Sequence, residues 1–461
     1  MNKRERYKRL ILFLTSAIIL SVQTAIFIDV WFNDYSNIGS NYFERGNYIV
    51  IAQYALMLFL FYKIYGGLKV GHLRVFGMMY TQFLSIICVN MITYLQLCLI
   101  GRWKFMTNFE PIMRMTLADL IVSTIWIVFT RFIYVKVFPP KKLLVVYGDY
   151  SPDNLIQKLS TREDKYLIAE AISIDNDIDY IRHEMLKYHN VVFTDIPSDL
   201  RNKLLKYCFA NNIRCYTVPK ISDIMIRSAE DVRLFDTTLH LFRNVGLTAE
   251  QAFLKRMMDI ILSSIACIIT APFMLIIAIA IKLCDRGPVF FVQDRLTKDG
   301  KVFKLIKFRS MYVHDETDEY CMTRKNDDRI TPVGKILRLL HLDELPQIYN
   351  IFKGEMSFVG PRPECPILAS EYCEFIPEFD FRLKVKAGLT GYAQVYGKYN
   401  TTPYDKLKLD LTYIQNYSLL LDIKLIMLTL KIFFQKETSE GIEDWQTTAA
   451  TKENLEKISQ K

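Results

Sequence analysis

The sequence predicts a membrane protein of three parts: an N-terminal four-helix transmembrane bundle, a Rossmann-like α/β middle domain, and a C-terminal mixed α/β domain with a re-entrant membrane helix hairpin. Three observations predict this class. The chain has 461 residues, too many for one ordinary domain, and 51% of them are hydrophobic. Four apolar runs of spanning length come first, and a fifth, interrupted by proline, follows later. Between them the pattern changes to short apolar strands that alternate with helices.

The first 140 residues are predicted to form the bundle, because a helix crosses a bilayer in about 20 residues. The expected spans are Leu10–Val30, Tyr48–Tyr65, Val75–Ile100 and Leu117–Phe138. Basic residues crowd the N-terminus and recur in the second connection, at Lys63, Lys69 and Arg74. Since cytoplasmic loops carry the excess of lysine and arginine, both ends of the bundle are predicted to be cytoplasmic. We interpret the first apolar run as an anchor rather than a cleaved leader.

Residues 141–245 are predicted to form the middle domain. The stretches KKLLVVYGD, NVVFTD and NIRCYTVP have the composition of buried strands, with helical stretches such as SDLRNKLLKYCFANN between them. This alternation favours a parallel sheet. A dinucleotide site would require several glycines after the first strand, where YGDYSPDN offers Gly148 alone. A structural or regulatory role is therefore favoured over cofactor binding.

The fifth apolar run, Met257–Leu283, contains Pro272 midway. Basic residues flank both of its ends: Lys255, Arg256, Lys282 and Arg286. A helix that crossed the membrane would export everything after residue 285, whereas cytoplasmic charge marks both ends. Proline removes a helical hydrogen bond, so the run can enter, break and return. We therefore expect a re-entrant helix over 254–284, within a domain of residues 246–435 that ends in a polar tail, 436–461.

Composition limits the partners. The net charge of +9 is explained equally well by membrane orientation on anionic lipid and by a polyanionic substrate. No basic helix or aromatic RNA-binding signature is found, so nucleic acid is not expected. The nine cysteines and six histidines are scattered without a CxxC pair, which argues against a zinc site and a disulfide framework.

Two adjacent acids, Asp343 and Glu344, lie in the apolar stretch LDELPQIYNIF. Pro346 is tolerated only in the first turn of a helix, so Asp343 is predicted at or near the N-cap. There the helix dipole and free N–H groups would keep the carboxylate ionised. A plain capping aspartate would explain a lone Asp, but here it must also explain the cations nearby.

Six basic residues accompany the acids and are candidates for binding phosphate: Arg295, Lys307, Arg309, Arg329, Arg338 and Arg362. The planar fork of arginine suits phosphate oxygens, and the prolines around Arg362 restrict its backbone. A divalent ion such as Mg²⁺, held by Asp343, would let a carboxylate approach a diphosphate. The residues therefore predict phosphoryl-group chemistry at the cytoplasmic face of the membrane.

From Leu254 to Lys436 the chain carries an ordered run of motifs: KRMMDIILS, GPVFFVQDR, GKVFKLIKFRSM, NDDRITPVGKILR, LDELPQIYNIFKGEMSFVGPRP, AGLTGYAQVYG and DLTYIQNYS. This run resembles the catalytic domain of the bacterial sugar transferases, the monotopic polyprenol-phosphate phosphoglycosyl transferases that begin capsule, exopolysaccharide and O-antigen assembly. With its four-span bundle the chain is similar to the long form of that family. It departs from the family pattern at Ala387, where proline is usual.

The resemblance implies transfer of a sugar 1-phosphate from a UDP-sugar to undecaprenyl phosphate, with release of UMP, at the bacterial inner membrane. Asp343 matches the nucleophile of the family, and Glu344 matches the second acid, which assists with protons or metal. Arg338 and Arg362 match its phosphate-binding arginines. The basic entry and helix break of its re-entrant segment are matched by Lys255, Arg256 and Pro272. A homodimer is plausible from the long-form relatives.

Two alternatives stay open at this point. A membrane-anchored nucleotide-sugar dehydratase would need a YxxxK pair on one helix, and the middle domain offers this spacing at Tyr216 and Lys220, with Pro219 between them. A non-catalytic membrane scaffold would need no acidic pair. The sequence leaves galactose, glucose and N-acetylated sugars all possible.

Overall fold

The computed structural model describes residues 7–36, 44–101, 103, 108–148, 150–242, 246–312, 329–397 and 401–432. The chain divides into two compact units, Met1–Val218 and Pro219–Lys461. The sequence placed the end of the middle domain at residue 245, whereas this division falls after Val218. The three-domain boundaries therefore stay a prediction, and the polar tail 436–461 lies outside the described residues.

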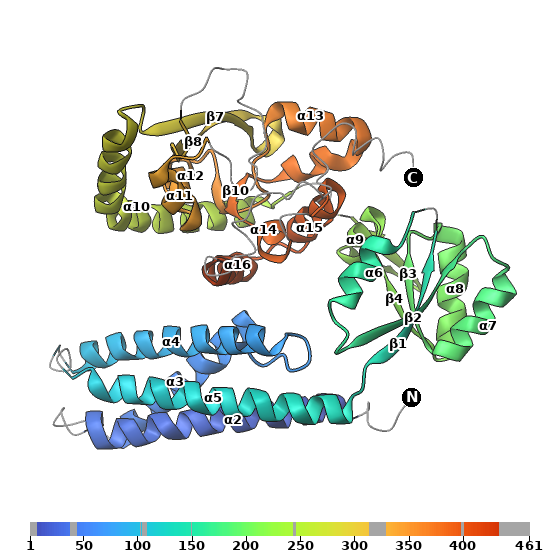
Figure 1. The fold of residues 1–461 in the computed structure, drawn as a ribbon, viewed down its shortest axis with the longest axis horizontal. Helices are drawn as coiled ribbons and strands as arrows, with labels where there is room; N and C mark the ends of the chain where they lie inside the picture. The colour runs from blue at the N-terminus through green and yellow to red at the C-terminus, as the bar shows by residue number, and fades with distance from the viewer. Residues whose placement is uncertain are drawn as a thin grey trace. The chain divides into compact units, whose positions relative to one another are not determined.

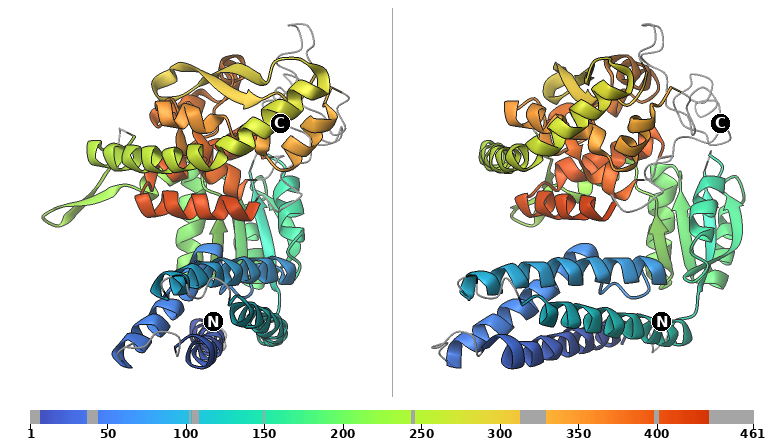
Figure 2. Two further views of the ribbon diagram at one scale, coloured as in Figure 1. Left: turned by 90° about the vertical axis from the view of Figure 1, so that its left-hand side faces the viewer. Right: turned by 60° about the vertical axis from the view of Figure 1, so that its left-hand side comes forward.

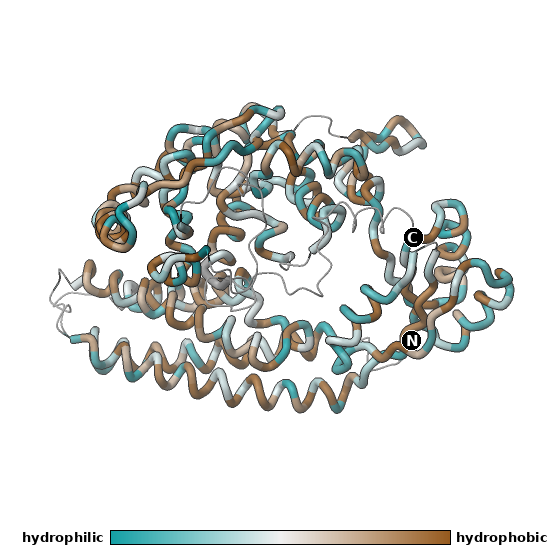
Figure 3. Tube along the Cα trace, turned by 45° about the horizontal axis from the view of Figure 1, so that its top comes forward, coloured by the Kyte–Doolittle hydropathy of each residue, from teal (hydrophilic) through white to brown (hydrophobic). Residues whose placement is uncertain are grey.

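Long apolar helices form the bundle of the first unit (Figure 1), and each of the four predicted spans corresponds to a helix long and apolar enough to cross a membrane. They are α2 (Lys8–Val30, continued by the π-helix η1, Trp31–Tyr35), α3 (Glu44–Tyr65), α4 (Val75–Ile100) and α5 (Glu110–Val137). Hydrophobic residues recur along these helices in Figure 3. Helix α5 begins earlier than the expected Leu117, because Pro111 is suited to a first helical turn.

Polar side chains join three of these helices inside the bundle. The hydroxyl of Tyr54 in α3 lies within hydrogen-bonding distance of Oδ1 of Asn90 in α4, at 3.1 Å, and of Oδ2 of Asp119 in α5, at 3.3 Å. Asn90 Nδ2 also donates to Asp119 Oδ2, at 3.3 Å. In a bilayer such groups must bond to one another, because lipid tails offer no partner. The network therefore holds α3, α4 and α5 together.

The middle of the chain forms a four-stranded parallel sheet in the order β2-β1-β3-β4, which confirms the predicted parallel sheet. Its elements are β1 (Lys141–Tyr147), α6 (Asp153–Ser160), β2 (Tyr166–Ser173), α7 (Ile178–Tyr188), β3 (Asn190–Thr194), α8 (Ser198–Ala210) and β4 (Arg214–Thr217). Strand β2 was not predicted. It is an edge strand in which only Ile172 is fully buried, so it lacks the continuous apolar run of β1.

Alternate residues of β1 face opposite sides of this sheet. Leu143 and Val145 belong to the apolar cluster that packs on α6, while Leu144 and Val146 belong to the cluster that packs on α7 and α8. This two-residue period explains why a strand covered by helices on both faces reads as an unbroken apolar run. Figure 1 shows the helices on both sides of the sheet.

The carboxyl ends of β1 and β3 touch at Gly148. A Cβ at this position would lie 2.1 Å from the carbonyl oxygen of Asp195, so the close approach requires glycine. In parallel sheets ligands bind where the strand order reverses, which here is between β1 and β3. The close contact with the Asp195 carbonyl thus explains why a glycine stands at position 148. Tyr216 lies in β4 and Lys220 precedes helix α9, so the two do not share a helix.

The second unit contains the remaining elements. Its helices are α9 (Ile221–Arg227), α10 (Ala249–Asp285), α11 (Pro332–Leu339), α12 (Gln347–Lys353), α13 (Pro366–Phe375), α14 (Tyr392–Tyr396), α15 (Pro403–Gln415) and α16 (Leu419–Ile432), with 3₁₀ turns η4 (Lys298–Gly300), η6 (Leu342–Glu344) and η7 (Pro377–Lys384). Its strands are β5 (Glu230–Leu234), β6 (Thr237–Leu241), β7 (Phe290–Leu296), β8 (Val302–Phe308), β9 (Ser357–Val359) and β10 (Gly388–Thr390). They pair as antiparallel β5–β6 and β7–β8 and as parallel β9–β10.

Helix α10 is 37 residues long and contains Pro272 in its interior. It is long and apolar enough to cross a membrane, and few of its residues are buried inside the protein. Its ribbon changes direction part-way along its length (Figures 1 and 2). Proline is the usual cause of such a bend, since its ring displaces the preceding turn. The predicted interruption is therefore a bend within one helix.

The N-terminal half of α10 packs on the rest of the second unit through buried charge. Lys255 Nζ lies 2.6 Å from Asp422 Oδ2 in α16 and 3.1 Å from the hydroxyl of Tyr413 in α15. Lys255 and Asp422 are both buried, so each needs the other.

Candidate active site

The two acids lie on the 3₁₀ turn η6, between α11 and α12. Helix α12 begins only at Gln347, with Pro346 at its N-cap and no side-chain capping bond. Asp343, predicted at or near the N-cap, lies three positions before it and does not cap the helix. The reason is local: residues 342–344 form a turn of their own, closed by the bond from Leu345 N to Leu342 O at 3.2 Å. The turn presents both carboxylates before the helix starts.

Glu344 is held between two cations. Its Oε1 atom lies 3.1 Å from Lys307 Nζ and 3.1 Å from Arg362 Nη2. Burial alone would raise the pKa of Glu344, but the charges of Lys307 and Arg362 outweigh it and lower the pKa to about 2. Glu344 is therefore ionised at neutral pH.

Asp343 differs from its neighbour. Burial raises the pKa of Asp343, and the negative charge of Glu344 raises it further, while the charges of Lys307 and Arg338 act in the opposite direction. Two adjacent carboxyls whose pKa values are pushed apart can take different roles in one reaction. The fixed charge belongs to Glu344, and the more basic carboxyl belongs to Asp343.

Lys307 reaches Glu344 because α12 is tied to β8. Asn350 of α12 accepts from the backbone N–H of Ile306 at 3.1 Å and donates to the carbonyl of Lys304 at 2.8 Å. This amide thereby satisfies two groups on the strand that carries Lys307. Asn350 was not predicted as a site residue, because its partner strand lies far away in the chain.

A cleft opens beside Glu344. Its lining consists of Arg295, Leu305, Lys307, Glu344, Gln347, Arg362, Pro363, Gly388 and Leu389. Three of the six predicted phosphate-binding cations, Arg295, Lys307 and Arg362, thus meet here. Arg295 also donates to Gln293 Oε1 at 3.1 Å and to the carbonyl of Pro363 at 3.2 Å.

The other three predicted cations lie elsewhere around the turn. Arg338 is close enough to lower the pKa of Asp343, and its Nε donates to Ser310 Oγ at 2.9 Å. Arg309 is buried, with its guanidinium bound to the carboxylate of Asp285 and to the carbonyl of Pro288, so it joins β8 to the end of α10. Arg329 lies beside the bridge of Met311 to Ile330, where its carbonyl accepts from Tyr312 N.

The three residues assigned to the re-entrant segment also differ in surroundings. Lys255 is in the buried ion pair described above, rather than at an exposed entry. Arg256 donates to the carbonyls of Ile351 and Phe352 at the end of α12, both at 2.8 Å. It therefore joins the long apolar helix α10 to α12, the helix that follows the acidic turn. Pro272 lies in the interior of α10.

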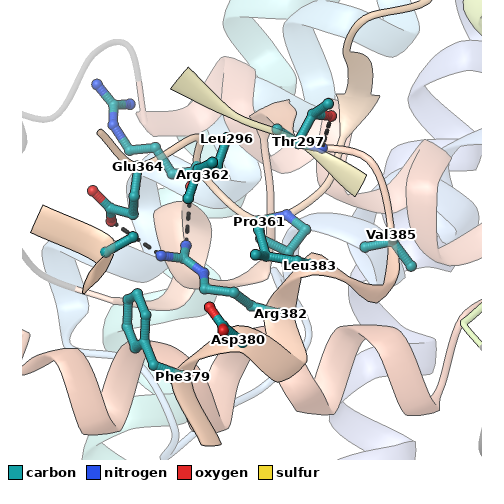
Figure 4. Close-up of a pocket in the computed structure, with 12 residues that line it drawn as sticks. Leu296, Thr297, Pro361, Arg362, Glu364, Phe379, Asp380, Arg382, Leu383 and Val385 are labelled. Carbon is teal, nitrogen blue, oxygen red and sulfur yellow. Dashed lines mark hydrogen bonds and ion pairs between the residues drawn. The ribbon is translucent and has the colours of Figure 1, made fainter. Parts of the chain in front are cut away.

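A second hollow adjoins Arg362 (Figure 4). Glu364 and Arg382 form a salt bridge of 3.1 Å there, and Arg382 forms another of 2.9 Å with Asp410. These residues were not predicted, because no spacing rule relates positions 364, 382 and 410.

Metal ligands are few at the acidic turn. Within the residues that the structure describes, no group of three or more His, Cys, Asp or Glu side chains could hold a metal ion. The predicted ligand Asp343 would supply one carboxylate of such a site, since Glu344 is already engaged by Lys307 and Arg362. This fits Mg²⁺, which takes one or two carboxylates and completes its shell with water and substrate phosphate.

Comparison with known proteins agrees with these features. Residues 250–436 match the family model described as bacterial sugar transferase. The chain is 37% identical over 258 residues to UDP-glucose:undecaprenyl-phosphate glucose-1-phosphate transferase of Klebsiella pneumoniae, covering 55% of this chain and 54% of that protein. It is 32% identical over 318 residues to UDP-N-acetylgalactosamine-undecaprenyl-phosphate N-acetylgalactosaminephosphotransferase of Aeromonas hydrophila, covering 66% of this chain and 69% of that protein.

A third relative carries another sugar in its name. The chain is 33% identical over 233 residues to galactosyl transferase CpsE of Streptococcus agalactiae serotype III, covering 48% of this chain and 50% of that protein. The matched region thus spans about half the length of the Klebsiella and Streptococcus relatives and about two thirds of the Aeromonas one. On this similarity and the family model, the chain belongs to the bacterial sugar transferase family.

Proposed function

We propose that this protein transfers a sugar 1-phosphate from a UDP-sugar to undecaprenyl phosphate and thereby initiates synthesis of a polysaccharide such as a capsule, exopolysaccharide or O-antigen. The observation that carries the proposal is the acidic turn itself: Asp343 stands next to Glu344, which Lys307 and Arg362 hold from two sides. The names of the relatives from Klebsiella and Aeromonas support the two substrates.

The reaction is proposed in two steps. A carboxylate oxygen of Asp343 attacks the β-phosphorus of the UDP-sugar, and the bond from that phosphorus to the bridging oxygen breaks, so that UMP leaves with the electron pair. A phosphate oxygen of undecaprenyl phosphate then attacks the aspartyl phosphorus, which releases the Asp343 carboxylate and forms undecaprenyl-diphosphate-sugar. Two displacements let a soluble donor and a lipid acceptor use one site in turn.

The charges around the turn suit this chemistry. Arg295, Lys307 and Arg362 line the cleft and would bind the diphosphate oxygens, while Arg338 lies near the attacking carboxyl. The raised pKa of Asp343 means a more basic and hence more nucleophilic carboxylate. Mg²⁺ bound by Asp343 and the diphosphate would neutralise phosphate charge and polarise the phosphorus. The engagement of Arg309 with Asp285 favours a structural part for that arginine.

We also propose that α10 is re-entrant, which keeps the acidic turn on the cytoplasmic side of the inner membrane. Its bend, its interior proline and the basic residues beyond its second end support this path. Native Cys284 is exposed near that end and offers a reporter. In a variant without the other cysteines, it and a cysteine placed at Glu250 should both resist an impermeant maleimide in intact cells. Labelling of one and not the other would mean a crossing helix.

The experiment that tests the activity is UMP release from a panel of UDP-sugars, with undecaprenyl phosphate as acceptor. The panel also identifies the sugar, since the relatives carry glucose, N-acetylgalactosamine and galactose in their names. Without acceptor, a donor labelled with ³²P at the β-phosphorus should label Asp343. Absence of UMP release from every donor would favour a non-catalytic scaffold. Intersecting kinetics without label would mean direct transfer between two bound substrates. A homodimer remains a prediction.

A further inference from the structure

The loop that carries Arg362 is fixed through its backbone. Each carbonyl oxygen from residue 361 to residue 364 accepts a hydrogen bond from a distant part of the second unit. The pairs are Gly388 N to Pro361 O at 2.9 Å, Arg382 Nη2 to Arg362 O at 3.0 Å, Arg295 Nη1 to Pro363 O at 3.2 Å and Leu296 N to Glu364 O at 2.9 Å. Two of the four donors are arginine side chains, Arg382 and Arg295.

Arg382 makes the most contacts of these donors. It comes from η7 and is 3% exposed. Besides the carbonyl of Arg362, it binds Glu364 Oε1 at 3.1 Å and Asp410 Oδ2 at 2.9 Å. In Figure 4 the carbonyl of Arg362 faces Arg382, while the Arg362 guanidinium extends away from it. That guanidinium reaches Glu344 instead. One residue thus contacts Arg382 through its backbone and the active site through its side chain.

The ion pair behind the loop is desolvated. Asp410 of α15 is 1% exposed, and burial raises its pKa to about 6 although Arg382 acts in the opposite direction. A buried charge without its partner is strongly destabilising, so Arg382 and Asp410 each hold the other in place. Arginine is required because its planar fork makes two hydrogen bonds to the loop and an ion pair with Asp410 at once, whereas the ammonium of lysine is a point charge.

We propose that Arg382 is a positioning residue of the transfer reaction. By donating a hydrogen bond to the carbonyl of Arg362, Arg382 fixes the backbone position from which the Arg362 guanidinium reaches Glu344 and the substrate diphosphate. The effect of Arg382 on catalysis rests on the proposed function, whereas its effect on the position of the loop does not. It assigns Arg382, Glu364 and Asp410 no contact with substrate.

The kinetic test compares Arg382→Lys in the native chain with Arg382→Lys in an Arg362→Lys background, both in detergent. If Arg382 acts through Arg362, the first change should lower kcat/KM for the UDP-sugar by roughly 10- to 100-fold. The second should cost less than about twofold, because the geometry that it disturbs is already lost. Equal losses in both backgrounds would mean a general structural role and would overturn the proposal. Lys408→Gln removes an ion pair from the same helix α15 without touching the loop, and it should leave UMP release unchanged.

A second readout does not depend on activity. Hydrogen exchange of the Leu296 and Gly388 amides, which donate to the loop, should be faster in Arg382→Lys than in the native chain and in Lys408→Gln. Unchanged exchange would overturn the inference, whatever the kinetics. Should Arg382→Lys not fold, Asp410→Asn leaves both bonds of Arg382 to the loop but removes its counter-ion, and it should accelerate the same amides to a smaller extent. If the native chain releases no UMP from any donor, the proposed function fails, while the exchange experiment still decides whether Arg382 holds the loop.

Discussion

Glu344 and Arg362 meet in the candidate active site at 3.1 Å, although they lie 18 positions apart in the chain. Lys307 approaches the same carboxylate oxygen at the same distance. Glu344 is thus already neutralised by two cations. Among the ion pairs of the described residues, none brings a cation equally close to the neighbouring Asp343. This asymmetry supports the proposal that the adjacent acids have different tasks, with the less compensated carboxyl of Asp343 attacking phosphorus.

Asp343→Asn should abolish turnover with little effect on stability. The amide has the size of the carboxyl but no nucleophilic charge, so UMP release should fall by roughly three orders of magnitude or more. Because the charge of Glu344 repels the native carboxylate of Asp343, replacing that carboxylate by an amide should not lower the melting temperature. Both quantities can be measured on one preparation in nanodiscs. Residual turnover within tenfold of the native rate would mean that Asp343 is not the nucleophile.

Arg362→Lys should be severe despite the conserved charge. The guanidinium of Arg362 binds Glu344, while the backbone carbonyl of Arg362 accepts a hydrogen bond from Arg382. The ammonium of a lysine cannot present two parallel donors to phosphate. We expect kcat/KM for the UDP-sugar to fall by roughly tenfold or more. Lys408→Gln serves as control. Native kinetics in Arg362→Lys would remove this arginine from the diphosphate site.

Stability should depend on Glu344 in a defined pH range. The pKa of Glu344 is about 2 in the folded protein, below the usual 4.5, so between these values the unfolded state binds more protons. The stabilisation by Glu344 is therefore complete above about pH 4.5 and is lost as the pH falls toward 2. The melting temperature of the native chain should exceed that of Glu344→Gln above pH 5, and the gap should narrow on acidification. A gap that widens at low pH would contradict the assigned ion pairs.

The boundary of the second unit can be tested by truncation. Ile221 and Ile224 of α9 are buried in one cluster with Leu407 and Leu411 of α15. A chain of residues 219–461 should therefore melt at a higher temperature than one of residues 248–461, since the shorter chain exposes this apolar surface. Both should release UMP if the chemistry lies downstream of Thr248. Identical melting temperatures would mean that α9 does not belong to this unit.

Hydropathy alone identified the long apolar helices, because a run of about 20 apolar residues is long enough to cross a bilayer as a helix. The alternating strands and helices likewise predicted the parallel sheet, and only the edge strand β2, which lacks a continuous apolar run, escaped notice. The motif around Asp343 and Glu344 led to the family that the comparisons show. All of these signals are local, in that neighbours in the chain determine them.

Tertiary structure decided what local pattern could not. Pro346 was compatible with a helix that began at Asp343, yet the acids form their own 3₁₀ turn between two packed helices. Six cations near the acids in sequence were equal candidates for binding phosphate. Packing brings Arg295, Lys307 and Arg362 to one cleft, whereas Arg309 forms an ion pair with Asp285. Arg382 gave no sequence signal at all, because its three partners come from a loop and a helix that meet it only in the fold. The sequence by itself determined which groups are present, whereas the partner of each charge is a long-range contact, set by the packing that buries it.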